Sequence, residues 1–206
     1  MNQLIDRLVE SFRQFPGIGP RQARRFVYFL LGEGDGYITR LSSELLALKD
    51  KINRCTDCGR FFALNGGKTE QCTICSDTNR NRELLMVVEK DIDLEAVRKA
   101  GIYDGHFFVL GGNIPILEKN PEEKVRIKEL KTRLAKGEIK ELILALSATT
   151  EGDYTAEYLK KALLPPPTGG ASPALKISTL GRGLSTGTEL EYSDTDTLKS
   201  ALKNRG

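Results

Sequence analysis

Residues 55–58 read Cys-Thr-Asp-Cys and residues 72–75 read Cys-Thr-Ile-Cys, and these two pairs use all four cysteines of the chain. Two cysteines separated by two residues place their thiolates on one short turn. Two such turns facing each other form the tetrahedral sulfur cage that zinc favours. We therefore predict one structural zinc ion per chain, held by Cys55, Cys58, Cys72 and Cys75. With sulfur at all four positions the metal would support the fold and leave no position for a substrate.

The alternative interpretation of these cysteines is two disulfides or a redox-active Cys-x-x-Cys pair. A redox pair sits at a strand-to-helix step of a thioredoxin-like unit, whereas these cysteines lie among turn formers such as Asp57, Gly59 and Asp77. Arg54 and Arg60 stand nearby and would offset thiolate charge. The flanking residues therefore favour the metal site.

The composition is that of a globular protein. Charged residues make up 29% of the 206 residues and hydrophobic residues 39%. No apolar run approaches the roughly 20 residues that cross a bilayer, and the N-terminus lacks the pattern of a signal peptide. Paired thiols without an export signal predict a cytoplasmic protein with no membrane partner. The net charge of +3 permits nucleic acid as a partner.

The only histidine, His106, excludes His-rich metal centres and disfavours a histidine-based catalytic triad. It stands at the start of a predicted strand, and we expect a structural role for it.

The N-terminal region predicts three helices, over about 3–14, from Pro20 to about 31, and over about 38–52, because apolar residues recur at a spacing of three to four. The first two are joined by Pro16-Gly17-Ile18-Gly19. Glycines let backbone N–H groups approach a phosphate closely, and the following helix terminus adds partial positive charge.

This turn is followed by arginines and resembles a helix-hairpin-helix, which grips the nucleic-acid backbone without reading sequence. We predict DNA contact through Gly17, Gly19, Arg21, Arg24 and Arg25. The alternative is a dimerisation hairpin with a solvated basic face, and both can hold at once.

Beyond residue 80 the pattern changes to α/β. Short apolar runs predict four strands, at 84–88, 107–110, 142–146 and 175–180, and helices alternate with them at 93–100, 121–136 and 154–164. This alternation predicts a parallel sheet. A proline-rich loop follows residue 164, and a short strand over 189–192 and a helix from Thr195 end the chain.

The predicted fold is therefore α/β in a multi-module α+β chain. Its parts are a helix-hairpin-helix region (1–54), a four-cysteine zinc finger (55–80), a parallel-sheet α/β domain (81–182) and a C-terminal strand-helix segment (183–206).

This order of modules resembles the RecR family of bacterial recombination mediators along essentially the whole chain. The matching segments are Phe-Pro-Gly-Ile-Gly-Pro at 15–20, Cys-Thr-Ile-Cys at 72–75 with Arg80 beyond it, Val-Val-Glu at 87–89, Thr-Thr-Glu-Gly-Asp-Tyr-Thr at 149–155, Gly-Arg-Gly-Leu at 181–184 and Glu-Leu-Glu-Tyr at 189–192. The resemblance implies a DNA-repair protein that works with RecO, and with RecF where it exists, to help load RecA onto single-stranded gaps or junctions. It also implies a homo-oligomer, from a dimer to a ring-shaped tetramer, that acts on DNA of the nucleoid.

The chain departs from the family pattern in three places. The gap between Cys58 and Cys72 is longer than usual, the proline-rich segment 164–173 resembles an insertion, and Ser185 and Thr188 replace residues that are usually Pro and Gly. These departures concern loop geometry and partner contacts.

The α/β part resembles a Toprim domain, whose catalytic members hold Mg²⁺ with a Glu after the first strand and an Asp-x-Asp after a later one. Glu89 fills the first role, but Ser147 and Thr149 occupy the two Asp positions. Neither hydroxyl replaces an ionised carboxylate as a ligand for a hard cation. We therefore expect a non-enzymatic domain, with at most weak Mg²⁺ binding.

Four carboxylates still gather where strands of the predicted sheet end: Glu89, Asp93, Glu151 and Asp153. Ligands of open α/β sheets bind at this edge. By resemblance, Glu89 and Asp93 match positions tied to partner binding. The alternative is that the carboxylates only cap helices, since Asp93 and Asp153 are each predicted to open one.

Overall fold

The computed structural model describes residues 3–64, 69–163, 175–181, 183–184, 187 and 190–203. The chain divides into two compact units, Met1–Asn53 and Arg54–Gly206. All of the proline-rich segment 164–173 and part of the long loop between Cys58 and Cys72 lie outside the described residues, as do Ser185 and Thr188. No helix among the described residues is long and apolar enough to cross a membrane.

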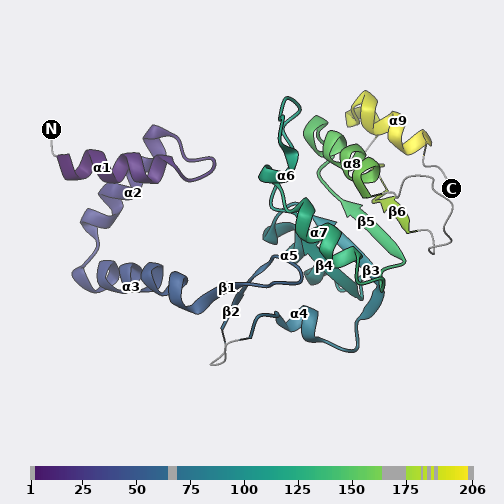
Figure 1. The fold of residues 1–206 in the computed structure, drawn as a ribbon. Helices are drawn as coiled ribbons and strands as arrows, with labels where there is room; N and C mark the ends of the chain where they lie inside the picture. Colours follow the sequence, from purple (N-terminus) through teal and green to yellow (C-terminus); the bar gives the residue numbers. More distant parts are fainter. Residues whose placement is uncertain are drawn as a thin grey trace. The chain divides into compact units, whose positions relative to one another are not determined.

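The first unit contains the predicted helical hairpin and third helix, as α1 (Gln3–Arg13), α2 (Pro20–Gly32) and α3 (Asp35–Lys51) (Figure 1). Its buried core is small, because Val9, Ala23 and Val27 are the only buried residues between positions 3 and 53, with Ile5, Phe12 and Ile18 packed against them. Helix α3 contributes no buried residue. The apolar stripes of the sequence therefore lie largely on the surface of this unit.

The second unit is built around the predicted parallel sheet, with strand order β4-β3-β5-β6 and parallel pairing throughout. Its strands are β3 (Asn81–Val88), β4 (Gly105–Val109), β5 (Glu141–Ala145) and β6 (Lys176–Thr179). The helices are α4 (Thr73–Ser76), α5 (Asp91–Ala100), α6 (Pro121–Lys124), α7 (Ile127–Leu134), α8 (Thr150–Leu163) and α9 (Thr195–Lys203). Two short strands, β1 (Ile52–Arg54) and β2 (Phe61–Ala63), pair before the sheet.

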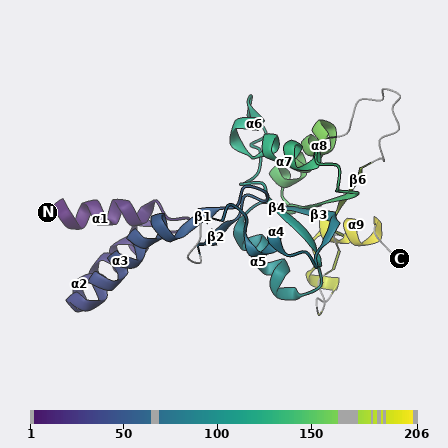
Figure 2. The same ribbon diagram turned by 60° about the horizontal axis from the view of Figure 1, so that its bottom comes forward.

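The sheet is covered on both faces, which explains why its strands read as continuous apolar runs. Because side chains alternate along a strand, Leu85 and Val87 face one cluster with residues of α7 and α8, while Met86 and Val88 face a second cluster with residues of α5. Figure 2 shows α7 and α8 on one side of the sheet and α4 and α5 on the other. The second cluster also contains Cys55, Cys58 and Cys72.

The predicted single helix over 121–136 is wrong, because it breaks between α6 and α7. Val125 is buried, and the backbone N–H of Arg126 donates to the carbonyl oxygen of Leu110 at 2.9 Å. The Nε–H of the Arg126 side chain donates to the carbonyl oxygen of Val109, also at 2.9 Å. These bonds to the end of β4 replace the bonds that a continuous helix would make.

The predicted strand over 189–192 is also wrong for its described part, since Leu190–Tyr192 form a 3₁₀ turn and Glu189 lies outside the described residues. A strand needs a neighbour for its backbone groups, and none of the described strands pairs with this segment. Apolar and charged residues alternate in this segment, but Tyr192 is 77% exposed, so the alternation does not mark a strand with one buried face.

Candidate metal centre and nucleic-acid interface

The four cysteines converge on one point. Their sulfur atoms all lie within 4.8 Å of one another, and the Cys58 and Cys72 sulfurs are 3.7 Å apart. Cys55, Cys58 and Cys72 are buried, and all four are free thiols and not disulfides. The sequence prediction of a four-cysteine cluster is therefore confirmed, and the cluster is able to bind a metal ion.

Backbone hydrogen bonds fold each pair into a tight knuckle. Between β1 and β2 the N–H of Gly59 donates to the carbonyl oxygen of Cys55 at 2.9 Å, and in α4 the N–H of Ser76 donates to that of Cys72 at 3.0 Å. The N–H of Thr56 donates to the carbonyl oxygen of Glu70 at 3.0 Å and joins the two knuckles. The cluster is thus positioned by the backbone before any metal is considered.

Hydrogen bonds among the four thiols shift their pKa values in opposite directions. Hydrogen bonds from Cys58 and Cys72 lower the pKa of the Cys55 thiol. Hydrogen bonds with Cys55 and Cys58 raise the pKa of Cys75. Four thiolates at this separation repel one another, and a bound cation stabilises all of them in the deprotonated form that metals require.

The first knuckle is fixed to the sheet. The N–H of Val109, the last residue of edge strand β4, donates to the carbonyl oxygen of Cys58 at 2.8 Å. An ion pair joins Asp57 to Lys136 at 2.8 Å, and another joins Arg60 to Glu95 of α5 at 3.0 Å. The cysteine cluster is therefore part of the structure of the α/β unit.

Arg126 is a further residue in this contact, and the sequence analysis missed it. Gly59 has φ +73°, and a Cβ atom there would lie 2.6 Å from Nε of Arg126. Burial lowers the pKa of the Arg126 guanidinium, with Arg54 as the next cause. Gly59 was recognisable as a turn former, but no local pattern identified the arginine that packs over it.

Removing the metal should destabilise the whole α/β unit, because three cysteines belong to the core beneath β3 and β4. We expect Cys72→Ser, or treatment with a chelator, to lower the unfolding temperature by about 10 °C or more, since roughly 2–4 °C corresponds to 1 kcal/mol in a protein of this size. Calorimetry measures the shift. Hydrogen exchange of β4 locates it, and Ser76→Ala on the exposed side of α4 is the control. Unchanged protection of β4 after chelation would contradict this role.

The hairpin turn of the first unit has the geometry that its glycines suggest. Gly17 has φ +77°, which favours glycine, whereas Gly19 is the N-cap of α2 with ordinary extended backbone. A Cβ atom at either position would meet no atom within 4 Å, so the turn is open to an approaching ligand. Pro20 occupies the first turn of α2, as predicted.

The arginines beyond this turn form an exposed cationic surface. Arg21, Arg24 and Arg25 are exposed and line a surface cavity of about 810 Å³ with Arg13. Arg13 is paired with Glu10 at 2.8 Å. The three arginines of α2 have no ion-pair partner among the described residues, so their charge is available to an anionic ligand.

The predicted acidic residues have unequal surroundings. Glu89 follows β3 and is buried, and its carboxylate accepts a hydrogen bond from the backbone N–H of Ser147, after β5, at 2.5 Å. Asp93 lies in the first turn of α5 and accepts the N–H of Lys90 at 2.9 Å, as a helix cap does. Glu151 and Asp153 are exposed in the first turn of α8.

Asp153 does not open its helix, contrary to the sequence prediction. Helix α8 begins at Thr150, and the hydroxyl of Thr149 accepts the N–H of Gly152 at 3.1 Å. The first turn packs tightly, since a Cβ atom at Gly152 would lie 2.0 Å from the carbonyl oxygen of Ser147. The two residues at the Asp-x-Asp positions therefore shape the start of α8.

A glycine-turn hairpin with exposed arginines, a four-cysteine metal site and a parallel α/β sheet together define a modular protein suited to nucleic acid. Comparison with known families matches residues 5–49 to the RecR helix-hairpin-helix, residues 83–171 to the Toprim domain and residues 183–205 to the RecR C-terminal region.

Curated relatives agree over nearly the full length. Proteins named recombination protein RecR from Acidothermus cellulolyticus, Dehalococcoides mccartyi and Lactococcus lactis subsp. cremoris are 39%, 36% and 35% identical. Each alignment covers 98% of this chain and 93–96% of the relative. The chain belongs to the RecR family, and this membership supports a role in DNA recombination.

Proposed function

We propose that this chain is a DNA-binding mediator of recombinational repair, which acts with RecO, and with RecF where it exists, to help load RecA onto single-stranded gaps. The observation that carries the proposal is the exposed, unpaired arginine surface of α2 beside an open glycine turn, in a chain of the RecR family. Arginines of this kind contact phosphates and position a protein on DNA without reading its sequence. The protein would act in the cytoplasm, at the nucleoid.

Arg21→Ala with Arg25→Ala should weaken binding to all DNA sequences alike. The two residues are one helical turn apart and share a face. The log–log dependence of DNA affinity on salt should become shallower by about 0.9 for each lost phosphate contact. Fluorescence anisotropy over a salt series on gapped DNA provides the measurement.

The matched control for this pair is Lys49→Ala with Lys51→Ala, which removes the same charge from the end of α3. An equal loss of affinity in both double variants would reduce the effect to net charge, and an unchanged salt slope in the arginine variant would refute contact at the hairpin.

Zinc is the metal that we propose for the cysteine cluster. A tetrahedral zinc ion with Zn–S distances of about 2.3 Å holds its sulfurs about 3.8 Å apart, and the Cys58–Cys72 separation of 3.7 Å suits this geometry. A set of four thiolates is typical of closed structural zinc sites, so the ion would stabilise the fold without taking part in a reaction.

We further propose that the Toprim domain is not an enzyme. Hard cations such as Mg²⁺ need several oxygen ligands with charge. Here Ser147 and Thr149 stand where catalytic Toprim domains carry aspartates, and the Glu89 carboxylate is engaged by the N–H of Ser147. Any Mg²⁺ binding at this edge would therefore be weak.

The exposed carboxylates of α8 suit a protein partner better than DNA, because they repel phosphate. A partner that itself binds DNA, as the family resemblance implies for RecO, would offer them a basic surface. We expect Glu151→Gln with Asp153→Asn to weaken binding to purified RecO, with the largest loss at low salt. Surface plasmon resonance over a salt series measures it, with Glu157→Gln on the same helix as the control. Equal RecO affinity in all three proteins would rule this surface out.

Glu89→Gln tests whether this end of the sheet is catalytic. We expect it to lower stability, since it weakens a buried charge-assisted hydrogen bond. Neither the wild-type chain nor the variant should show Mg²⁺-dependent nuclease or primase turnover. Robust wild-type turnover that Glu89→Gln abolishes would establish an enzyme instead.

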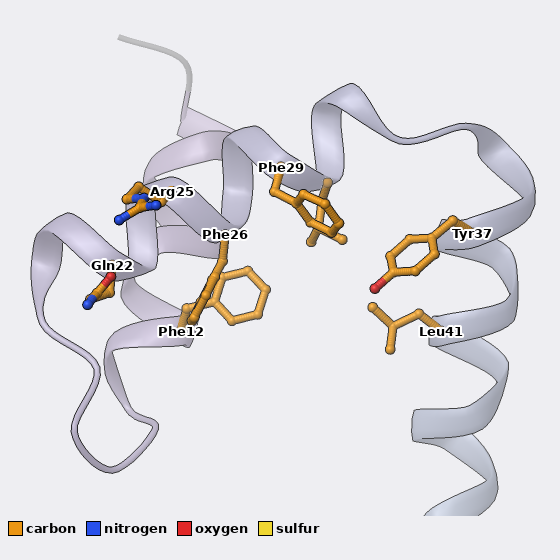
Figure 3. Close-up of a pocket in the computed structure, with 8 residues that line it drawn as sticks. Phe12, Gln22, Arg25, Phe26, Phe29, Tyr37 and Leu41 are labelled. Carbon is orange, nitrogen blue, oxygen red and sulfur yellow. The ribbon is translucent and has the colours of Figure 1, made fainter.

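Self-association is the remaining part of the proposal, and it rests on the apolar surface of the first unit. Phe26, Phe29 and Leu45 are 41%, 52% and 57% exposed, although the unit buries only three residues. Phe26 and Phe29 of α2 line a cavity of about 590 Å³ together with Tyr37 and Leu41 of α3 (Figure 3), and the rings of Phe29 and Tyr37 pack edge to face. A second copy of this unit offers the same kind of apolar surface in return, as a twofold interface requires.

Phe29→Asp should therefore reduce the oligomer mass in solution, because it places a charge in the apolar cavity. Analytical ultracentrifugation measures the mass, and circular dichroism verifies that the helices remain. Leu117→Asp is the control, since Leu117 is 92% exposed in the second unit. An oligomer unaffected by Phe29→Asp would show that self-association uses another surface.

A further inference from the structure

A cavity of about 330 Å³ lies at the amino ends of β3 and β4, beside the second cysteine knuckle and the C-terminal end of α7. This is the edge of the sheet opposite to the acidic residues described above. Charged side chains dominate its lining: Asp57, Arg82, Arg133, Lys136 and Glu138. The knuckle contributes Gln71 and Cys75, and β4 contributes His106.

The charges of this cavity do not cancel. Lys136 is paired with Asp57 at 2.8 Å, so these two charges neutralise each other. The guanidinium groups of Arg82 and Arg133 have no hydrogen-bond or ion-pair partner among the described residues, and Glu138 is the one carboxylate left to balance them in the lining. Two free guanidinium groups in one cavity are suited to a tetrahedral oxyanion, which accepts two parallel hydrogen bonds from each.

His106 adds an unsatisfied polar group at the same place. The residue is 2% exposed, and neither of its ring nitrogens has a hydrogen-bond partner within the described part of the chain. Burial lowers its pKa, with Arg133 and Arg80 as the next causes. An imidazole ring has at least one N–H to donate in either protonation state. A buried donor without a partner costs stability, and such a group calls for an explanation.

The sheet itself is irregular here. Strand β3 pairs Asn81 with Gly105 and then Leu85 with His106, so residues 82–84 are extra on β3 opposite a single step of β4. Bulges of this kind occur beside functional sites, where they redirect a side chain. This one carries Arg82 at the cavity next to His106.

We propose that this cavity binds a phosphate group, held by the guanidinium groups of Arg82 and Arg133 and by the N–H of His106. The phosphate belongs either to a nucleic-acid backbone or to a small free phosphate compound, since both present the same oxyanion. The site lies in the second unit and goes beyond the proposed function, because none of its residues belongs to the hairpin that contacts DNA.

Calorimetric titration of the metal-loaded full chain with inorganic phosphate, at an ionic strength held constant with chloride, tests the site. We expect saturable binding of one phosphate per chain. Arg82→Gln with Arg133→Gln should weaken it about tenfold or more, since charge-assisted hydrogen bonds are lost. Lys160→Gln with Lys161→Gln removes the same charge from α8 and should leave binding unchanged.

His106→Phe provides a readout that net charge does not move. It removes the two unsatisfied nitrogens, so the unfolding temperature without phosphate should rise while phosphate affinity falls. Unchanged affinity in this variant would remove His106 from the site. If the Arg82→Gln, Arg133→Gln variant does not fold, Arg82→Lys with Arg133→Lys keeps the charge. This variant should still weaken phosphate binding several-fold, because lysine lacks the planar guanidinium group that donates two parallel hydrogen bonds to an oxyanion.

A short single-stranded oligonucleotide, tested in the Arg21→Ala, Arg25→Ala background, distinguishes the two sources of phosphate. Loss of oligonucleotide affinity on adding Arg82→Gln and Arg133→Gln identifies a backbone phosphate. Loss of inorganic phosphate binding alone identifies a small ligand. The proposal is overturned if the folded Arg82→Gln, Arg133→Gln variant binds both probes as tightly as the Lys160→Gln, Lys161→Gln control does.

Discussion

The hydrogen bond from the Val109 N–H to the carbonyl oxygen of Cys58 connects the first cysteine knuckle to the parallel sheet of the second unit. Strand β4 is an edge strand, and an exposed edge leaves backbone groups unpaired and open to aggregation. Here the first cysteine knuckle takes up that last N–H and places the cysteines over Met86 and Val88. The cysteine cluster thus completes the face of the sheet that α5 covers only in part, so residues that precede the α/β part in sequence belong to its core.

Much of this arrangement was predictable from local pattern. The strands were recognisable as apolar runs because both faces of the sheet are buried. The hairpin was recognisable from Pro16-Gly17-Ile18-Gly19 between two apolar stripes. The paired spacing of the cysteines predicted the cluster for a similar reason, since each knuckle is a local structure.

The errors arise where distant contacts override local pattern. Residues 121–136 have the periodicity of one helix, but the backbone and side chain of Arg126 bond to the end of β4. The side-chain partner lies 17 residues away, outside the stretch that carries the periodicity. The run 189–192 alternates like a strand but finds no described neighbour to pair with. Glu89 was recognised as a residue of the sheet edge, whereas its bond to Ser147, 58 residues away, needed the structure.

The parallel sheet places the acidic residues of α8 and the pair Arg82 and Arg133 at opposite ends of its strands. Glu89 follows the carboxyl end of β3, and Glu151 and Asp153 lie in the first turn of α8, which follows β5. At the amino ends, Arg82 of β3 and Arg133 of α7 line the cavity. Because the strands are parallel, all their carboxyl ends lie at one end of the sheet and all their amino ends at the other. An acidic edge repels nucleic acid and a cationic one attracts phosphate, so one small domain is able to offer a protein partner and a phosphate ligand separate surfaces.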